Sequence, residues 1–247
     1  MLNDFQIGVV VPALNEEDSI VSIINELCEV FEKKKFSYKI LVVDDGSTDN
    51  TSKLLNNLKK ENLIIHRNEE PQGIGAAYKL GMKKLNSNFI TWIPSDGEIS
   101  PQVYEKLPNE LDEKNLYLFY PSSGKENRSF LRRYISRTYI ELLNFLFRNK
   151  IKYYNANTVI SRQLLSKIQL NSNGFTISAE VVIKGMILAD SYTQIPFTLH
   201  KRNAGEAKAI SLKNLIDVFL CIIQLYFRYF KYNFNKTGAY ENTIKWK

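Results

Sequence analysis

The sequence predicts an α/β fold built on a doubly wound, mostly parallel β-sheet. In roughly the first hundred residues, apolar runs of strand length alternate with longer runs whose apolar residues recur at helical spacing. The strand-like runs are continuously apolar, which is typical of parallel strands covered on both faces. This order implies right-handed crossovers between neighbouring parallel strands. Because ligands bind beyond the carboxyl ends of strands in such sheets, we look for function in the residues that follow each strand.

The first half of the chain contains the clearest elements. Its first helix is marked by an apolar stripe that includes Ile20, Ile24, Leu27 and Phe31. Strands are expected over residues 5–11, 38–43, 63–66 and 89–93, and helices over residues 19–35, 49–60 and 73–85.

The second half is less regular. Helices are expected over residues 101–114, 130–148, 179–189 and 211–231, strands over 116–120, 159–160 and 192–199, and polar loops over 122–128 and 201–209. No internal repeat and no low-complexity linker divides the chain.

Composition narrows the classes of partner. The 247 residues carry a formal net charge of +7, which favours anionic partners such as nucleotides or phospholipid surfaces. Nucleic acid is not expected, because no nucleic-acid-binding module is recognisable.

The two cysteines, Cys28 and Cys221, lie outside any Cys/His cluster, which argues against zinc. The acidic Asp4 argues against a signal peptide, and the lack of a run of about 18 apolar residues argues against a transmembrane helix.

Acidic residues follow two of the predicted strands. Asp44 and Asp45 close the second strand, where a carboxylate can accept hydrogen bonds from a base or from ribose hydroxyls. Asp96 and Glu98 follow the fourth strand, and their hard oxygens can hold a divalent cation that bridges a diphosphate. Taken alone, each pair is also explained by turn formation and helix capping.

Two other segments carry candidate residues. Gly73 opens a helix together with Gly75, and small residues there permit close packing near a ligand site. The loop over residues 201–209 holds Arg202 and Lys208, and such cations can close on a diphosphate and stabilise a departing nucleotide. A solvated basic loop accounts for the same two cations.

The helices expected over residues 130–148 and 211–235 are rich in aromatic and basic residues. A helix with a wide apolar face and flanking cations can lie in the plane of a bilayer. Packing against the sheet or against a partner subunit accounts for the same pattern. The sequence therefore leaves both peripheral membrane association and a homo-oligomer open.

Several motifs, in register with the strand pattern, resemble glycosyltransferase family 2 and, within it, the polyprenyl-phosphate branch that includes dolichol-phosphate mannosyltransferases. They are residues 11–17 (VPALNEE), 42–49 (VVDDGSTD), 73–77 (GIGAA), 132–137 (RRYISR) and 202–208 (RNAGEAK). The resemblance implies a GT-A fold, Rossmann-like, in one domain over residues 1–210. Its nucleotide-binding half covers about residues 1–100 and its acceptor half about residues 101–210, before an amphipathic C-terminal helix and tail over residues 211–247.

The resemblance also implies roles for single residues. Asp96, with Glu98, would hold Mg²⁺ or Mn²⁺ and thereby the donor diphosphate. Glu180 lies sixteen residues before Pro196, a spacing that the family shares, and would have an acceptor-site, catalytic or structural role. The donor nucleotide would be surrounded by Pro12, Leu14, Glu16, Asp44, Asp45, Gly73 and Ser95, and its phosphates by Arg132, Arg133, Arg202 and Lys208.

The chain departs from the family pattern in three places. The signature Asp-x-Asp-x-Gln falls on residues 94–98, so Pro94 replaces the first acid and Glu98 stands at the glutamine. Ala207 occupies a serine position in the basic loop. An arginine usual after the fifth strand is absent, and Arg128 is a candidate to replace it.

The implied function is an inverting transfer of a sugar from a UDP- or GDP-sugar to a polyprenyl-phosphate lipid, for cell-envelope polysaccharide synthesis. The enzyme would be cytoplasmic and peripherally bound to the inner face of the membrane. One alternative is a transferase that extends a surface glycan. Another is an inactive nucleotide-sugar-binding protein, which Pro94 and the missing arginine motivate. A sugar nucleotidyltransferase is disfavoured, because residues 12–17 stand where its glycine- and arginine-rich loop would be.

Overall fold

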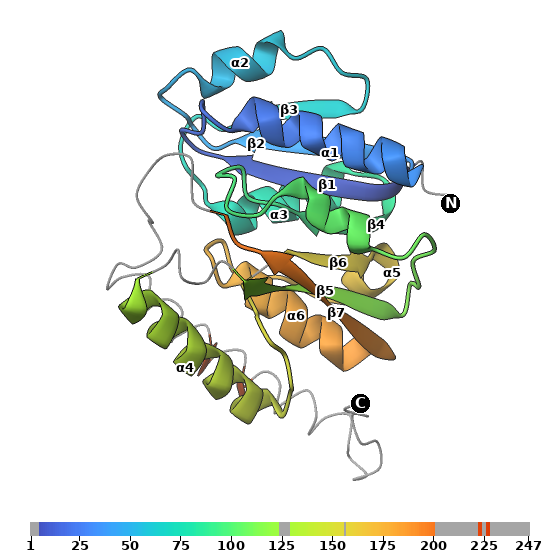
Figure 1. The fold of residues 1–247 in the computed structure, drawn as a ribbon, viewed down its shortest axis with the longest axis vertical. Coiled ribbons are helices and arrows are strands. Elements are labelled where there is room, and N and C mark those ends of the chain that lie inside the picture. The colour runs from blue at the N-terminus through green and yellow to red at the C-terminus, as the bar shows by residue number, and fades with distance from the viewer. Residues whose placement is uncertain (1–4, 124–128, 156, 201–221, 224–225, 228–247) are drawn as a thin grey trace.

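A computed structural model describes residues 5–123, 129–155, 157–200, 222–223 and 226–227. They form a mixed α/β fold around one seven-stranded sheet with the order β3-β2-β1-β4-β6-β5-β7 (Figure 1). The strands are β1 (Phe5–Ala13), β2 (Tyr38–Asp44), β3 (Leu63–Arg67), β4 (Ser87–Trp92), β5 (Asn115–Ser123), β6 (Thr158–Ser161) and β7 (Ser191–Thr198). The first four are parallel, β6 is antiparallel to both of its neighbours, and β7 is parallel to β5. This confirms the predicted α/β class and the mostly parallel sheet.

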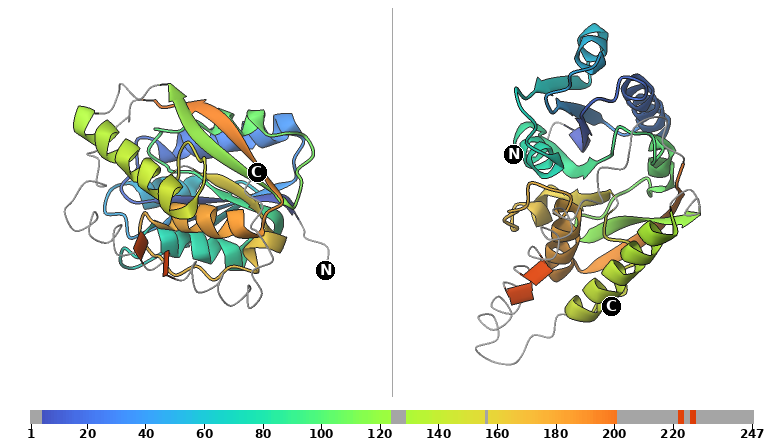
Figure 2. Two further views of the ribbon diagram at one scale, coloured as in Figure 1. Left: turned by 90° about the horizontal axis from the view of Figure 1, so that it is seen from below. Right: turned by 90° about the vertical axis from the view of Figure 1, so that its left-hand side faces the viewer.

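Helices cover both faces of the sheet, as Figure 2 shows in its left-hand view. The helices are α1 (Ile20–Lys34), α2 (Thr51–Asn57), α3 (Ile74–Lys84), α4 (Phe130–Phe147), α5 (Arg162–Leu165) and α6 (Ile177–Leu188), with the 3-10 helix η1 (Pro101–Lys106). Alternate residues of the central strands point to opposite faces, so Val9 and Val11 pack with α1 and η1 while Val10 packs with α3 and α6. The burial of both faces accounts for the continuously apolar strands.

The structure corrects several predicted boundaries. The helix predicted over residues 101–114 is only the 3-10 turn η1, because Pro108 forces the residue before it, Leu107, into extended backbone. The helix predicted over residues 49–60 is limited to α2. β5 extends to Ser123, into the predicted loop, and the short helix α5 was not predicted. Of the predicted helix over residues 211–231, only residues 222–223 and 226–227 are described, and they are helical.

Within the described residues, no helix combines the length and the apolar character that crossing a bilayer requires.

Gly81 brings α3 close to β1. A Cβ atom added at Gly81 would collide with the side chain of Val10, which is fully buried in the adjacent strand. A β-branched side chain in a packed core has few alternative rotamers, so it cannot move aside easily. The absence of a side chain at Gly81 therefore sets how closely the helix approaches the sheet.

We expect Gly81→Ala to lower the free energy of unfolding by about 1–3 kcal/mol, because overpacking outweighs the gain of about 1 kcal/mol in helix propensity. Urea unfolding monitored by circular dichroism measures this change. Gly174→Ala is the matched control, since a Cβ at Gly174 would meet nothing within 4 Å. Equal stability of the two variants would contradict the packing argument.

Candidate active site

The acidic segments predicted to bind the donor meet at one edge of the sheet. Ala13, at the end of β1, lies opposite Asp44 at the end of β2, and the amide of Asp45 donates to the Ala13 carbonyl at 2.8 Å. On the other side of β1, the Ser95 hydroxyl donates to the Pro12 carbonyl at 2.7 Å. The turn after β1 is therefore flanked by the segments that contain Asp45 and Asp96.

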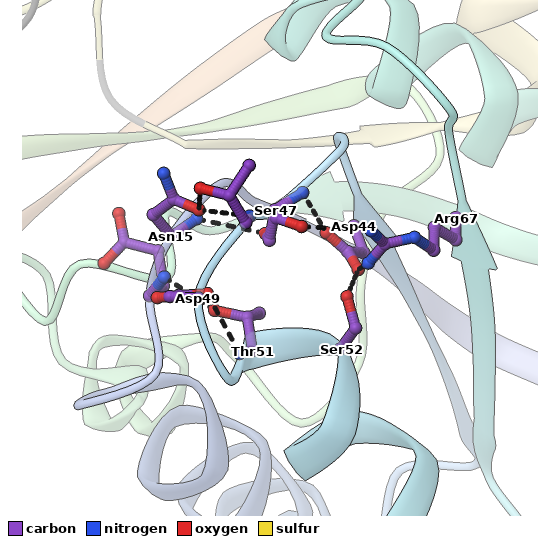
Figure 3. A network of polar contacts seen from close by, with 9 residues as sticks. Asn15, Asp44, Ser47, Asp49, Thr51, Ser52 and Arg67 are labelled. Atoms are coloured by element: carbon purple, nitrogen blue, oxygen red, sulfur yellow. Dashed lines mark hydrogen bonds and ion pairs between the residues drawn. The ribbon is translucent and has the colours of Figure 1, made fainter.

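Asp44 is held by three neighbours on its own edge of the sheet (Figure 3). Its carboxylate accepts the Ser47 amide at 2.9 Å, the Ser52 hydroxyl, and Nη1 of Arg67 at 2.6 Å. Burial alone would raise the pKa of Asp44, but the bonds from Ser47 and Ser52 and the charge of Arg67 hold its pKa below the ordinary value. Asp44 is therefore ionised at neutral pH.

A second set of bonds clamps the turn after β1 to the turn after β2. The Ser47 hydroxyl accepts the amide of Asn15 at 3.0 Å, and the Asn15 side chain accepts the amide of Thr48 at 2.8 Å (Figure 3). Asn15 adopts a left-handed conformation with φ of 58°, which asparagine tolerates better than most residues. The next amide, that of Glu16, donates to the Thr51 hydroxyl at 2.9 Å. These bonds fix the backbone of the segment containing Leu14 and Glu16.

Asp45 joins the end of β2 to the start of α3. Its carboxylate accepts the amides of Gln72 and Gly73, both at 2.8 Å, and the side-chain amide of Asn68 at 2.7 Å. Gly73 has φ of 90°, a conformation that other residues rarely adopt. The predicted role of Gly73 at the donor site stays a prediction.

Asp96 and Glu98 follow β4 in a tight turn. Asp96 is buried, its Oδ1 accepts the amide of Glu98 at 3.0 Å, and Gly97 between them has φ of 74°. The carbonyl of the preceding Ser95 accepts the Ser19 hydroxyl at 2.6 Å, which ties this turn to the beginning of α1. Two carboxylates after a strand end suit Mg²⁺ or Mn²⁺, which use few protein ligands when a diphosphate completes the shell. Within the described residues, no group of three or more His, Cys, Asp or Glu side chains could hold a metal ion without such help.

The structure describes only some of the predicted basic residues. Arg133 lies exposed on α4, with its guanidinium 6.0 Å from the centre of the Phe130 ring. Arg132 belongs to the same helix, but its side chain lies outside the described part of the structure, as do Arg128, Arg202 and Lys208. Their predicted contact with the donor phosphates stays a prediction.

Glu180 is buried in the first turn of α6. It accepts hydrogen bonds from the amides of Asn171 and Ser172 and from Lys184. Burial would raise the pKa of Glu180, but the bonds from Lys184 and the two amides hold its pKa below the ordinary value.

A surface cavity of about 650 Å³ lies beside the partners of Asp45, between α3 and the β2–β3 edge. Asn68 and Gln72 line it, together with Lys79 and Asn173. Neither Asp45 nor Asp96 lines this cavity.

Sequence reasoning missed Arg67 and Ser52, the partners of the Asp44 carboxylate. Arg67 is the last residue of β3, so the strand-end rule that selects Asp44 selects Arg67 as well. Ser52 offers no such signal, because only the fold of α2 turns its hydroxyl towards Asp44.

The fold is that of a GT-A-type glycosyltransferase domain. The family described as Glycosyl transferase family 2 matches residues 8–171. The chain therefore belongs to glycosyltransferase family 2, which confirms the family that the motifs predict.

Similar proteins include enzymes with named substrates. A dolichol-phosphate mannosyltransferase of Pyrococcus furiosus is 24% identical over 212 residues, which cover 82% of this chain and 59% of that protein. An uncharacterized protein of Methanocaldococcus jannaschii is 28% identical over 190 residues, or 74% of this chain and 76% of that protein. The glucosyl-3-phosphoglycerate synthase of Mycobacterium tuberculosis, solved with Mn²⁺, UDP-glucose and phosphoglyceric acid, has a TM-score of 0.68 at 18% identity, covering 90% of this chain and 80% of that one.

The lowered pKa values of Asp44 and Glu180 predict a loss of stability in acid. A carboxyl whose pKa is lower in the folded than in the unfolded state stabilises the fold above its unfolded pKa. That contribution disappears as the pH falls through the folded value. We expect the free energy of unfolding to decrease as the pH is lowered past about 4.5, the ordinary pKa of a glutamate. Urea unfolding between about pH 3 and about pH 7 tests this, and a fold more stable at the acid end would contradict it.

Proposed function

We propose that this protein transfers a sugar, with inversion, from a nucleotide-diphosphate sugar to a polyprenyl-phosphate lipid. The observation that carries the proposal is the convergence of the segments containing Asp45 and Asp96 on the end of β1. Such an edge can hold a nucleoside on one side and a diphosphate on the other. Family membership supports the reaction class, and the residues at this edge support the donor class.

The donor site is assigned to residues of the first half. Pro12, Leu14 and Glu16 would border the base and ribose with Asp44 and Asp45, and Gly73 and Ser95 would line the same site. A divalent cation held by Asp96 and Glu98 would neutralise charge on the diphosphate as the glycosidic bond breaks. The M. tuberculosis enzyme was solved with Mn²⁺ and UDP-glucose, which supports Mn²⁺ and a uridine nucleotide; Mg²⁺ and GDP-sugars are the alternatives.

Cations would complete the stabilisation of the leaving group. Arg132, Arg133, Arg202 and Lys208 are proposed to face the diphosphate, where preorganised positive charge lowers the barrier most because negative charge grows there. An acceptor phosphate is already an anionic nucleophile, so this reaction needs no strong general base.

The outer face of α4 supports a lipid acceptor. Phe145 is 82% exposed and Phe130 is 76% exposed, and Leu131 and Tyr134 lie exposed on the same helix. Arg133 and Arg137 are exposed beside them. Leu143 and Phe147 pack α4 against the core, and Figure 1 shows the helix at the periphery of the fold. Its exposed apolar and basic surface would therefore contact a bilayer at the cytoplasmic face. The named substrate of the P. furiosus relative, a dolichol phosphate, supports the same acceptor class.

A glycan acceptor and an inactive nucleotide-sugar-binding protein are the competing functions. Incubation with radiolabelled UDP- and GDP-sugars, Mn²⁺ and either undecaprenyl phosphate or a polysaccharide acceptor, together with calorimetry of UDP and GDP binding, distinguishes all three. The proposal predicts label in the organic phase. Label that enters only a polysaccharide acceptor would favour the glycan function, and nucleotide binding without turnover of any donor would favour the inactive protein.

Replacement of the proposed metal ligand should separate catalysis from folding. We expect Asp96→Asn to lower turnover by about 100-fold or more and to remove the effect of Mn²⁺ on nucleotide binding. Isothermal titration calorimetry and the transfer assay measure these effects. Asp112→Asn is the matched control, because Asp112 accepts the amide of Lys114 in the same way but precedes β5, away from the site. Wild-type activity in Asp96→Asn would contradict the assignment.

Membrane contact can be tested by substitutions in α4 of the full chain. We expect the double variant Phe130→Ser with Phe145→Ser to bind vesicles containing anionic phospholipid at least about tenfold more weakly, because two exposed aromatic side chains no longer enter the interface. Co-sedimentation with such vesicles measures this. Phe175→Ser is the control, since Phe175 is 51% exposed but lies outside α4. Equal loss in both variants would argue against a specific role for α4.

A further inference from the structure

Glu180 bears a buried charge that the proposed transfer reaction does not use. The residue is 1% exposed. One carboxylate oxygen lies 2.9 Å from the Ser172 amide, and the Asn171 amide lies 3.1 Å from both oxygens. Lys184, one turn further along α6, donates to Glu180 at 2.5 Å and to the carbonyl of Gln169 at 2.5 Å. A buried carboxylate with charge-assisted bonds to two successive amides fixes the backbone that it binds.

The loop that Glu180 holds, residues 171–173, packs directly on the start of α3. The carbonyl of Asn173 accepts the amide of Gly75 at 2.8 Å. A Cβ atom on Gly75 would come within 2.5 Å of the Ser172 carbonyl, and one on Gly73 within 2.6 Å of the Asn173 carbonyl. Both distances are shorter than a Cβ atom tolerates, so only glycine permits this contact between the two backbones.

The start of α3 in turn holds the end of β2. The amides of Gln72 and Gly73 both donate to Asp45, whose own amide donates to Ala13 at the end of β1. Hydrogen bonds and the short backbone segments between them therefore connect α6, in the second half of the chain, to the edge of the sheet assigned to the donor. Lys79 of α3 adds a further bond across the same contact, to the side chain of Asn173.

We propose that Glu180 is a positioning residue for the donor nucleotide and not a general base for the acceptor. It acts through residues 171–173 and Gly75 on the backbone that carries Asp45. This assignment rests on the proposed donor site. A base must reach the proton that it removes, whereas the Glu180 carboxylate is directed onto the Asn171 and Ser172 amides. Loss of its charge should loosen the start of α3 and weaken donor binding while the chemical step is retained.

The variant Glu180→Gln tests this directly, because it keeps the size of the side chain and removes the charge that receives the two amides. Calorimetry with UDP and GDP in the presence of Mn²⁺ should show about tenfold weaker binding of the preferred nucleotide. Steady-state kinetics should show a donor KM raised by about the same factor, with the acceptor KM and kcat nearly unchanged. Hydrogen exchange should be faster over residues 71–77, a readout that needs no ligand.

Two further variants make the result decisive. Gly75→Ala should reproduce the loss of nucleotide affinity, because its Cβ displaces the same loop from the other side. Gly75→Ala also tests the proposed positioning role if Glu180→Gln does not fold. Gly185→Ala is the control on α6, since the atoms nearest to its Cβ belong to Leu116 and Ile160. Its nucleotide affinity should stay at the wild-type value even if its stability falls.

Three results would overturn the assignment. One is a large loss of kcat in Glu180→Gln with unchanged nucleotide affinity, the signature of a base. Another is an equal loss of affinity in Gly185→Ala, which would show general destabilisation. A third is unchanged hydrogen exchange over residues 71–77. Failure of the wild-type protein to bind either nucleotide would instead overturn the proposed function, and it is recognised because it precedes any substitution.

Discussion

Asp45 joins three segments that are distant in sequence, through its carboxylate on one side and its backbone amide on the other. It accepts the amides of Gln72 and Gly73 at the start of α3, and its own amide donates to Ala13 at the end of β1. Because Asp45 is buried, leaving these groups unpaired would cost more than an exposed bond contributes. The turns after β1 and β2 and the start of α3 are therefore positioned together, and the candidate site at this edge depends on that arrangement.

Much of this edge could be predicted from the sequence, for a simple physical reason. Parallel strands covered on both faces are apolar throughout, so a carboxylate such as Asp44 marks the point where a strand leaves the core. The rule that parallel sheets bind ligands at their carboxyl ends then selects Asp45 and Asp96 as candidate binding residues. The alternation of strands and helices could also be predicted, and β1 to β4 lie within a few residues of their predicted positions.

What the sequence could not predict depends on contacts between distant segments. The pairing of Asp44 with Arg67 and the bonds of Glu180 to Asn171 and Ser172 arise from topology and have no local signature. The length of η1 depends on Pro108, whose effect on Leu107 overrides an otherwise helical pattern. The antiparallel strand β6 is only four residues long, and its sequence pattern is too short to indicate how it pairs with its neighbours. The roles proposed for Arg202 and Lys208 stay predictions, because these residues lie outside the described part of the chain.

The proposed function depends on a nucleoside diphosphate and its cation occupying the edge formed by β1, β2 and β4. Anomalous diffraction at the manganese edge, from crystals grown with UDP or GDP and Mn²⁺, tests this most directly. We expect a manganese peak within about 2.3 Å of an Asp96 carboxylate oxygen, with the base beside the turn after β1. A manganese peak remote from Asp96, or a nucleotide bound elsewhere on the protein, would contradict it.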